Sequence, residues 1–140
     1  MHPEKALNTF SEIIEKENLD DINLTIYYSN VLTPLPATLN DLIKGYGQKI
    51  VVDGVQLTKH IDLIKTINNI ELMQVKYESR LDARIHYIFS NKGRKIFDVT
   101  MWGFNEEGDN YEVVFINGVA VKYEDIFYEI IMPFLPDVLR

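Results

Sequence analysis

The chain has 140 residues, of which 46% are hydrophobic and 25% are charged, and its formal net charge is -7. This composition is typical of a globular protein, and the length predicts a single domain over residues 1–140 with a well-buried core. The negative charge disfavours nucleic acid and membrane surfaces as partners, and the absence of cysteine excludes disulfides, zinc–thiolate sites and thiol nucleophiles.

The N-terminal sequence MHPEKALNTF lacks the apolar region of a secretion signal, and no apolar run reaches the roughly 18 residues that a membrane span requires. We therefore expect a cytoplasmic protein. The three histidines, His2, His60 and His86, have no metal-ligand spacing, so no metal is expected. The sequence GYGQK lacks the context of a phosphate loop, and no cofactor is expected either. The frequent Ile, Asn, Lys and Tyr residues indicate a bacterial source.

An amphipathic helix is predicted over residues 3–17, because Pro3 suits a first helical position and apolar residues follow at helical spacing. The β-branched and aromatic run INLTIYYS predicts a strand over residues 22–29. Thr38 and Thr58 are each expected to cap a further helix.

Between those two helices, the sequence KIVVDGVQL places Asp53 and Gly54 between β-branched runs, and this pattern predicts a small hairpin over residues 49–57. From Glu71 onward the apolar residues recur with period two, which predicts an antiparallel meander with short turns. Its five strands are expected at residues 71–78, 82–90, 95–104, 111–116 and 119–123. A last helix, EDIFYEIIM, is expected to end before Pro133.

These elements predict an α+β fold, in which a twisted and mostly antiparallel sheet carries N-terminal, middle and C-terminal helices. The order helix, Asp-Gly hairpin, helix and meander, over about residues 40–116, is similar to that of the cone-shaped NTF2-like fold. That resemblance implies a curved sheet that wraps around helices and leaves a pocket at the sheet face.

The turn NKG fits a three-residue hairpin loop that pairs Ser90 with Arg94. Counting outward from this loop places His86 opposite Asp98 and gathers the apolar residues on the other face. The following strands are expected to add four apolar residues to the face of Asp98, namely Val114, Ile116, Val119 and Val121. This end of the sheet would then be covered on both faces.

The polar face of this hairpin is the first candidate site. A histidine opposite an aspartate is a pair that can orient an imidazole for acid–base chemistry, and a neighbouring arginine suits an anion. Such cross-strand pairs also stabilise ordinary sheets, and no nucleophile accompanies this one. The candidate ligand or partner residues are Arg84, His86, Asp98, Thr100 and Trp102.

Acidic residues are concentrated in two other stretches, the first 21 residues and the turn NEEGDN. Charge runs of this kind are common on solvated surfaces, and they also steer basic partners. The candidate partner-binding residues are Glu12, Glu15, Asp20, Asp21, Glu106, Glu107 and Asp109.

No motif with a known chemistry appears, so a binding role is favoured over an enzyme. The first hypothesis is a small acidic bacterial protein-binding module, such as an immunity or inhibitor protein that masks a basic partner. The second is a small-molecule-binding protein, or a hydrolase or isomerase, with a pocket at the sheet face. The third is a structural subunit that homodimerises through the sheet or the apolar C-terminal helix.

Overall fold

The computed structural model describes residues 2–16, 18–29, 43, 48–76, 85–101 and 113–136. The strands are β1 (Ile22–Tyr28), β2 (Gln48–Val52), β3 (Ile85–Asn91), β4 (Arg94–Met101), β5 (Val113–Ile116) and β6 (Val119–Lys122). The α-helices are α1 (Pro3–Glu15), α2 (Gly54–Thr58), α3 (Ile61–Lys65) and α4 (Ile126–Glu129). Two 3-10 helices, η2 (Thr66–Asn69) and η4 (Met132–Phe134), follow α3 and α4.

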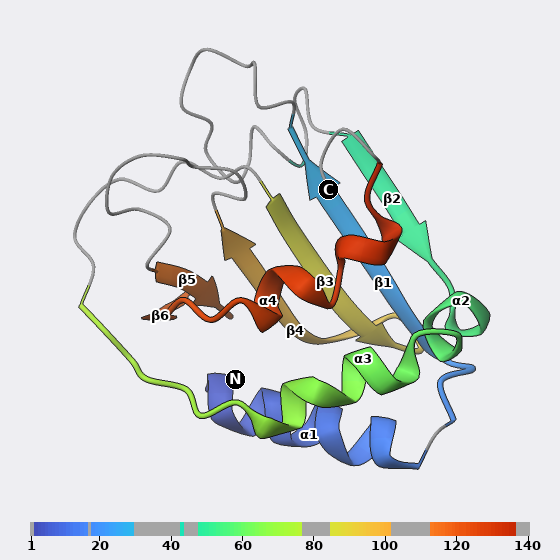
Figure 1. The fold of residues 1–140 in the computed structure, drawn as a ribbon, viewed down its shortest axis with the longest axis horizontal. Coiled ribbons are helices and arrows are strands. Elements are labelled where there is room, and N and C mark those ends of the chain that lie inside the picture. The colour runs from blue at the N-terminus through green and yellow to red at the C-terminus, as the bar shows by residue number, and fades with distance from the viewer. Residues whose placement is uncertain are drawn as a thin grey trace.

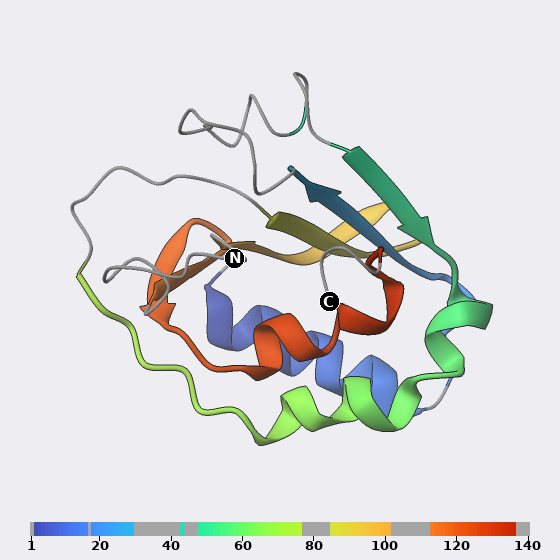
Figure 2. The ribbon, with the colours of Figure 1, turned by 45° about the horizontal axis from the view of Figure 1, so that its top comes forward.

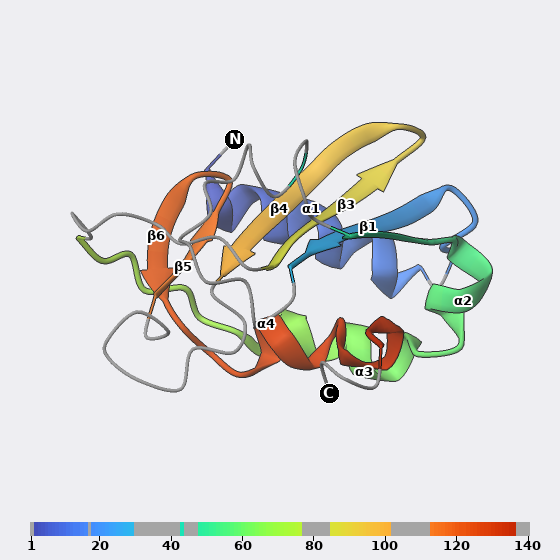
Figure 3. The same ribbon diagram turned by 90° about the horizontal axis from the view of Figure 1, so that it is seen from above.

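The strands form one antiparallel sheet in the order β2-β1-β3-β4-β5-β6, as Figure 1 shows. Helices α1, α3 and α4 lie on the same side of this sheet (Figure 3). The predicted α+β class is therefore confirmed. We call the side of the sheet that carries these helices the inner face and the opposite side the outer face.

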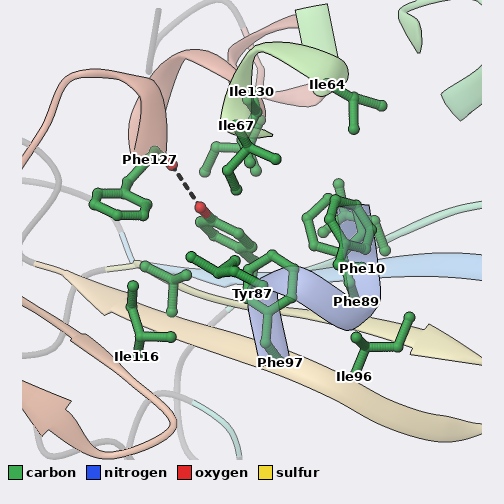
Figure 4. Close-up of a cluster of buried hydrophobic side chains, with 14 of the residues drawn as sticks. Phe10, Ile64, Ile67, Tyr87, Phe89, Ile96, Phe97, Ile116, Phe127 and Ile130 are labelled. Carbon is green, nitrogen blue, oxygen red and sulfur yellow. Dashed lines mark hydrogen bonds between the residues drawn. The ribbon is translucent and has the colours of Figure 1, made fainter. Parts of the chain in front are cut away.

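The inner face holds the hydrophobic core. Helix α1 buries an apolar stripe against the sheet, and the Phe10 ring lies 4.6 Å from the ring of Phe89 and 5.0 Å from that of Phe97. The buried Tyr87 hydroxyl donates a 2.7 Å hydrogen bond to the backbone oxygen of Phe127, which ties β3 to α4 (Figure 4). Burial raises the pKa of Tyr87 well above its ordinary value, so the side chain stays a neutral donor.

The register of the β3–β4 hairpin differs from the prediction. The loop has two residues, Lys92 and Gly93, both with positive φ, as a type I′ turn requires. A bulge then shifts the pairing between Phe89 and Ser90. The shorter loop and the bulge each shift the register by one residue, so the observed register differs from the predicted one by two. A shift of two residues keeps every side chain on its predicted face but gives it a different partner on the opposite strand. His86 lies opposite Thr100, and Asp98 lies opposite Ile88.

The predicted register of β4 with β5 was wrong by one residue, which exchanges the two faces of the strand. Ile116 pairs with Val99 and Phe115 pairs with Thr100, so Ile116 is on the inner face. Four apolar residues expected on the face of Asp98 are consequently on the inner face, namely Val114, Ile116, Val119 and Val121. The turn at Asn117 and Gly118 has the positive φ values expected for type I′.

The hairpin predicted over residues 49–57 is absent. Strand β2 pairs with β1, and the Asp53 side chain caps α2 by accepting a 3.0 Å hydrogen bond from the Gln56 backbone nitrogen. A Cβ on Gly54 would lie 1.9 Å from the backbone oxygen of Leu19. This glycine is therefore required by close backbone packing rather than by a turn.

The strand predicted over residues 71–78 is also corrected. Residues 71–76 are extended but belong to no named strand, and a single bridge joins Gln74 to Val121. They run to the β6 edge of the sheet (Figure 2), so they do not pair with β3 as the predicted meander required.

The two predicted helix caps have different outcomes. The Thr58 hydroxyl donates to the Gly54 carbonyl at the end of α2, so Thr58 does not cap the next helix. The helix predicted after Thr38 lies outside the described residues.

Candidate functional site

A row of side chains crosses four strands on the outer face, at the centre of the predicted polar cluster. Lys49, Tyr27, His86 and Thr100 are cross-strand neighbours on β2, β1, β3 and β4. The Lys49 ammonium lies 5.8 Å from the centre of the Tyr27 ring, and that ring stacks on His86 at 6.1 Å. We call these four residues the outer-face row.

His86 and Thr100 form a closed pair within this row. Each is 3% exposed, and Nδ1 of His86 lies 2.9 Å from the Thr100 hydroxyl. Burial lowers the pKa of His86; the Asp98 carboxylate raises it and the Lys95 ammonium lowers it further. The imidazole is thus held neutral and hydrogen-bonded inside the protein, an arrangement that satisfies two buried polar groups.

Asp98 has partners of its own. In a regular strand, residues three apart lie on opposite faces. The bulge between β3 and β4 adds one residue to β4 and so brings Lys95 to the same face as Asp98. The Lys95 ammonium lies 2.8 Å from the Asp98 carboxylate. The backbone nitrogen of Asp98 donates to the side-chain oxygen of Asn117. The other two predicted cluster residues, Arg84 and Trp102, lie outside the described residues.

The acidic residues predicted from the N-terminal stretch are all exposed. Glu12 and Glu15 are on α1, whose apolar stripe is buried, and Asp20 and Asp21 are in the turn before β1. Glu15 accepts a 2.7 Å hydrogen bond from the Asn68 side chain, which joins α1 to η2. The remaining predicted acidic residues, Glu106, Glu107 and Asp109, are not in the described part of the chain.

The apolar C-terminal segment packs inside this chain. Phe127, Ile130 and Ile131 are fully buried, and Leu135 is 1% exposed. These side chains belong to the same core cluster as Phe10 and the inner face of the sheet. These four apolar residues of the segment are therefore part of the core of this chain.

A groove that the sequence analysis did not identify lies between α1 and residues 67–72. Its volume is about 220 Å³. Its lining residues come from both elements: Glu4, Leu7, Asn8, Ser11, Ile67, Asn68, Ile70, Glu71 and Leu72. The sequence does contain one signal of it, because Glu4, Asn8 and Ser11 recur at helical spacing and form a polar stripe beside the apolar one.

Within the described ranges, no group of three or more His, Asp or Glu side chains could hold a metal ion. None of the helices that the structure describes is long and apolar enough to cross a membrane. Comparisons of the chain with protein-family models, with curated proteins and with solved structures found no significant match.

Proposed function

We propose that this protein is a small binding module that masks a basic protein partner, in the manner of an immunity or inhibitor protein. The contact surface that we assign to it is formed by α1 and the turn that follows. The observation that supports the proposal is the exposure of Glu12, Glu15, Asp20 and Asp21 along one continuous part of the chain. We call these four residues the acidic surface.

The local charge of this region is strongly negative. Residues 1–21 include six acidic residues and two lysines. Among the ion pairs that the structure describes, one reaches the acidic surface, between Asp21 and Lys92 at 3.9 Å, and both side chains are largely exposed. Exposed pairs of this kind are weak, so Asp21 stays available to attract a basic partner, and Glu15 keeps its charge and exposure while one of its oxygens accepts from Asn68.

The scaffold under the acidic surface is rigid enough to present it. The stripe of α1 that faces the sheet is buried, and Pro3 and the His2 side chain fix the beginning of the helix. Because α1 packs on β4, the positions of Glu12 and Glu15 are set by the core and not by the loop connections. Preorganised charges of this kind raise the rate of association with an oppositely charged protein.

The proposal is tested with a short peptide of alternating arginine and alanine as a model of a basic partner surface. We expect Glu12→Lys combined with Asp20→Lys to slow association with this peptide about tenfold or more at low salt, and the difference to shrink at high salt as exposed charges are screened. The matched control is Glu124→Lys combined with Glu129→Lys, which changes the net charge equally at exposed positions outside α1. Equal rates for the two double variants would contradict the assigned surface.

A further inference from the structure

The groove between α1 and residues 67–72 combines an apolar lining with carboxylates. Leu7 and Ile67 are buried, and Ile70 and Leu72 are half-buried. Glu4 on α1 and Glu71 after η2 line the same groove and are exposed. A ligand that enters the groove therefore meets a mainly polar surface, with negative charges at Glu4 and Glu71 and a smaller apolar contact from the half-buried Ile70 and Leu72.

Asn68 joins the two walls of the groove. Its side-chain nitrogen donates a 2.7 Å hydrogen bond to the Glu15 carboxylate, and this bond fixes the orientation of the amide. The amide oxygen is then left buried, and it has no hydrogen-bond partner. Because this oxygen is buried, a ligand in the groove meets the carboxylates of Glu4 and Glu71 and not the amide oxygen of Asn68.

The size of the groove limits what can occupy it. A volume of about 220 Å³ is smaller than the roughly 300 to 1,000 Å³ typical of pockets for drug-sized ligands. It suits one side chain better than a whole metabolite. A side chain with an apolar stem and several donors at a cationic head matches both the lining and the acceptors.

We propose that this groove binds the side chain of an arginine from the basic partner, with the aliphatic stem against the apolar lining and the guanidinium between Glu4 and Glu71. Arginine is assigned rather than lysine because the guanidinium presents five donors in a planar fork and is less strongly hydrated than an ammonium. The inference rests on the proposed function and names the residue that the partner inserts.

The experiment uses a short peptide with one arginine flanked by leucines, together with versions that carry citrulline or lysine in its place. Affinities are measured by isothermal titration calorimetry with the full-length protein. We expect the arginine peptide to bind about tenfold or more tightly than the citrulline peptide, because hydrogen bonds to charged groups are the stronger class. The lysine peptide should fall between the two.

Two variants place the binding in the groove. Glu4→Gln combined with Glu71→Gln should remove the preference for arginine over citrulline, and Ser11→Tyr, which fills the groove without a charge change, should do the same. The matched control is Glu12→Gln combined with Asp20→Asn, which removes the same charge from the acidic surface and should keep the preference. Thermal melts of each variant confirm folding.

The outcomes separate the groove from the acidic surface. The groove proposal is wrong if a groove variant keeps the preference for arginine over citrulline while the acidic-surface control binds the arginine peptide more weakly. The proposed function would then still stand. Equal binding of the lysine and arginine peptides contradicts the assigned guanidinium. Failure of the wild-type protein to bind either cationic peptide more tightly than the citrulline peptide rejects both proposals.

Discussion

The two faces of the sheet differ in how their side chains are held. On the inner face, aromatic rings from α1, β3 and β4 contact one another in a single buried cluster, with Phe10 at its centre. On the outer face, the outer-face row is held by individual pairs, among them the hydrogen bond between His86 and Thr100. The inner face therefore determines the stability of the fold, whereas a change on the outer face should be local in its effect.

The largest expected effect comes from emptying the centre of the inner face. We expect Phe10→Ala to lower the free energy of unfolding by about 3 to 5 kcal/mol, because the cavity is surrounded by rigid aromatic neighbours. Ile88→Ala on the half-buried outer face should cost less than half as much. Urea denaturation measures both, and equal losses would show that the outer face is packed as tightly as the inner one.

A smaller effect is expected from the hydrogen bond that joins β3 to α4. Tyr87→Phe removes the donor to the Phe127 carbonyl and leaves a buried acceptor unpaired, at a cost of about 1 to 3 kcal/mol. Tyr27→Phe is the control on the outer face, since the aromatic ring and its contacts are kept. If the two substitutions shift the urea midpoint equally, the hydrogen bond from Tyr87 to Phe127 does not add to the stability of the fold.

The outer-face pair is expected to contribute less. Thr100→Val keeps the shape of the side chain but removes the hydroxyl that bonds His86, and we expect a loss of about 1 kcal/mol. Thr25→Val, on a half-buried position of β1, is the matched control. A midpoint for Thr100→Val at or above that of the control would mean that the buried imidazole is satisfied without Thr100.

The smallest effect is a dependence of stability on pH. Burial lowers the pKa of His86 in the folded state, so the unfolded chain binds a proton first as the pH falls below about 6.5, the ordinary value for histidine. The contribution of His86 is present above that pH and is lost as the pH falls toward the lowered folded value. Between pH 7 and 5 the wild-type protein should lose more stability than His86→Asn, and parallel losses would refute the assignment.

The sequence was sufficient for the faces of the central hairpin but not for its pairs. Side chains on a strand alternate between the two faces, with Tyr87 and Phe89 on one face and His86 and Ile88 on the other. A register shift by an even number of residues leaves these faces unchanged. The two-residue turn and the bulge produced such an even displacement, so the inner face was predicted correctly although His86 was assigned the wrong partner. The predicted register of β4 with β5 differs from the observed one by a single residue, so there the inner and outer faces of β5 were exchanged.

Other features depend on contacts between residues distant in the sequence. Asp53 and Gly54 fit a hairpin turn and a helix N-terminus equally well by local pattern. The close approach of the Leu19 backbone, far from them in the chain, accompanies the helical outcome. The groove likewise requires α1 and residues 67–72 to pack together, which no local pattern specifies. Local periodicity predicts elements, whereas sites between elements require the fold.

The central claim is that this protein binds a basic partner on its helix side and that the outer-face row is structural. The most direct test is to titrate the isotopically labelled protein with the arginine peptide and to follow its backbone amide signals by NMR. We predict that the signals of α1 and residues 67–72 shift, while those of Tyr27, His86 and Thr100 stay in place. Shifts confined to the outer-face row would contradict the account and would make that face the binding site.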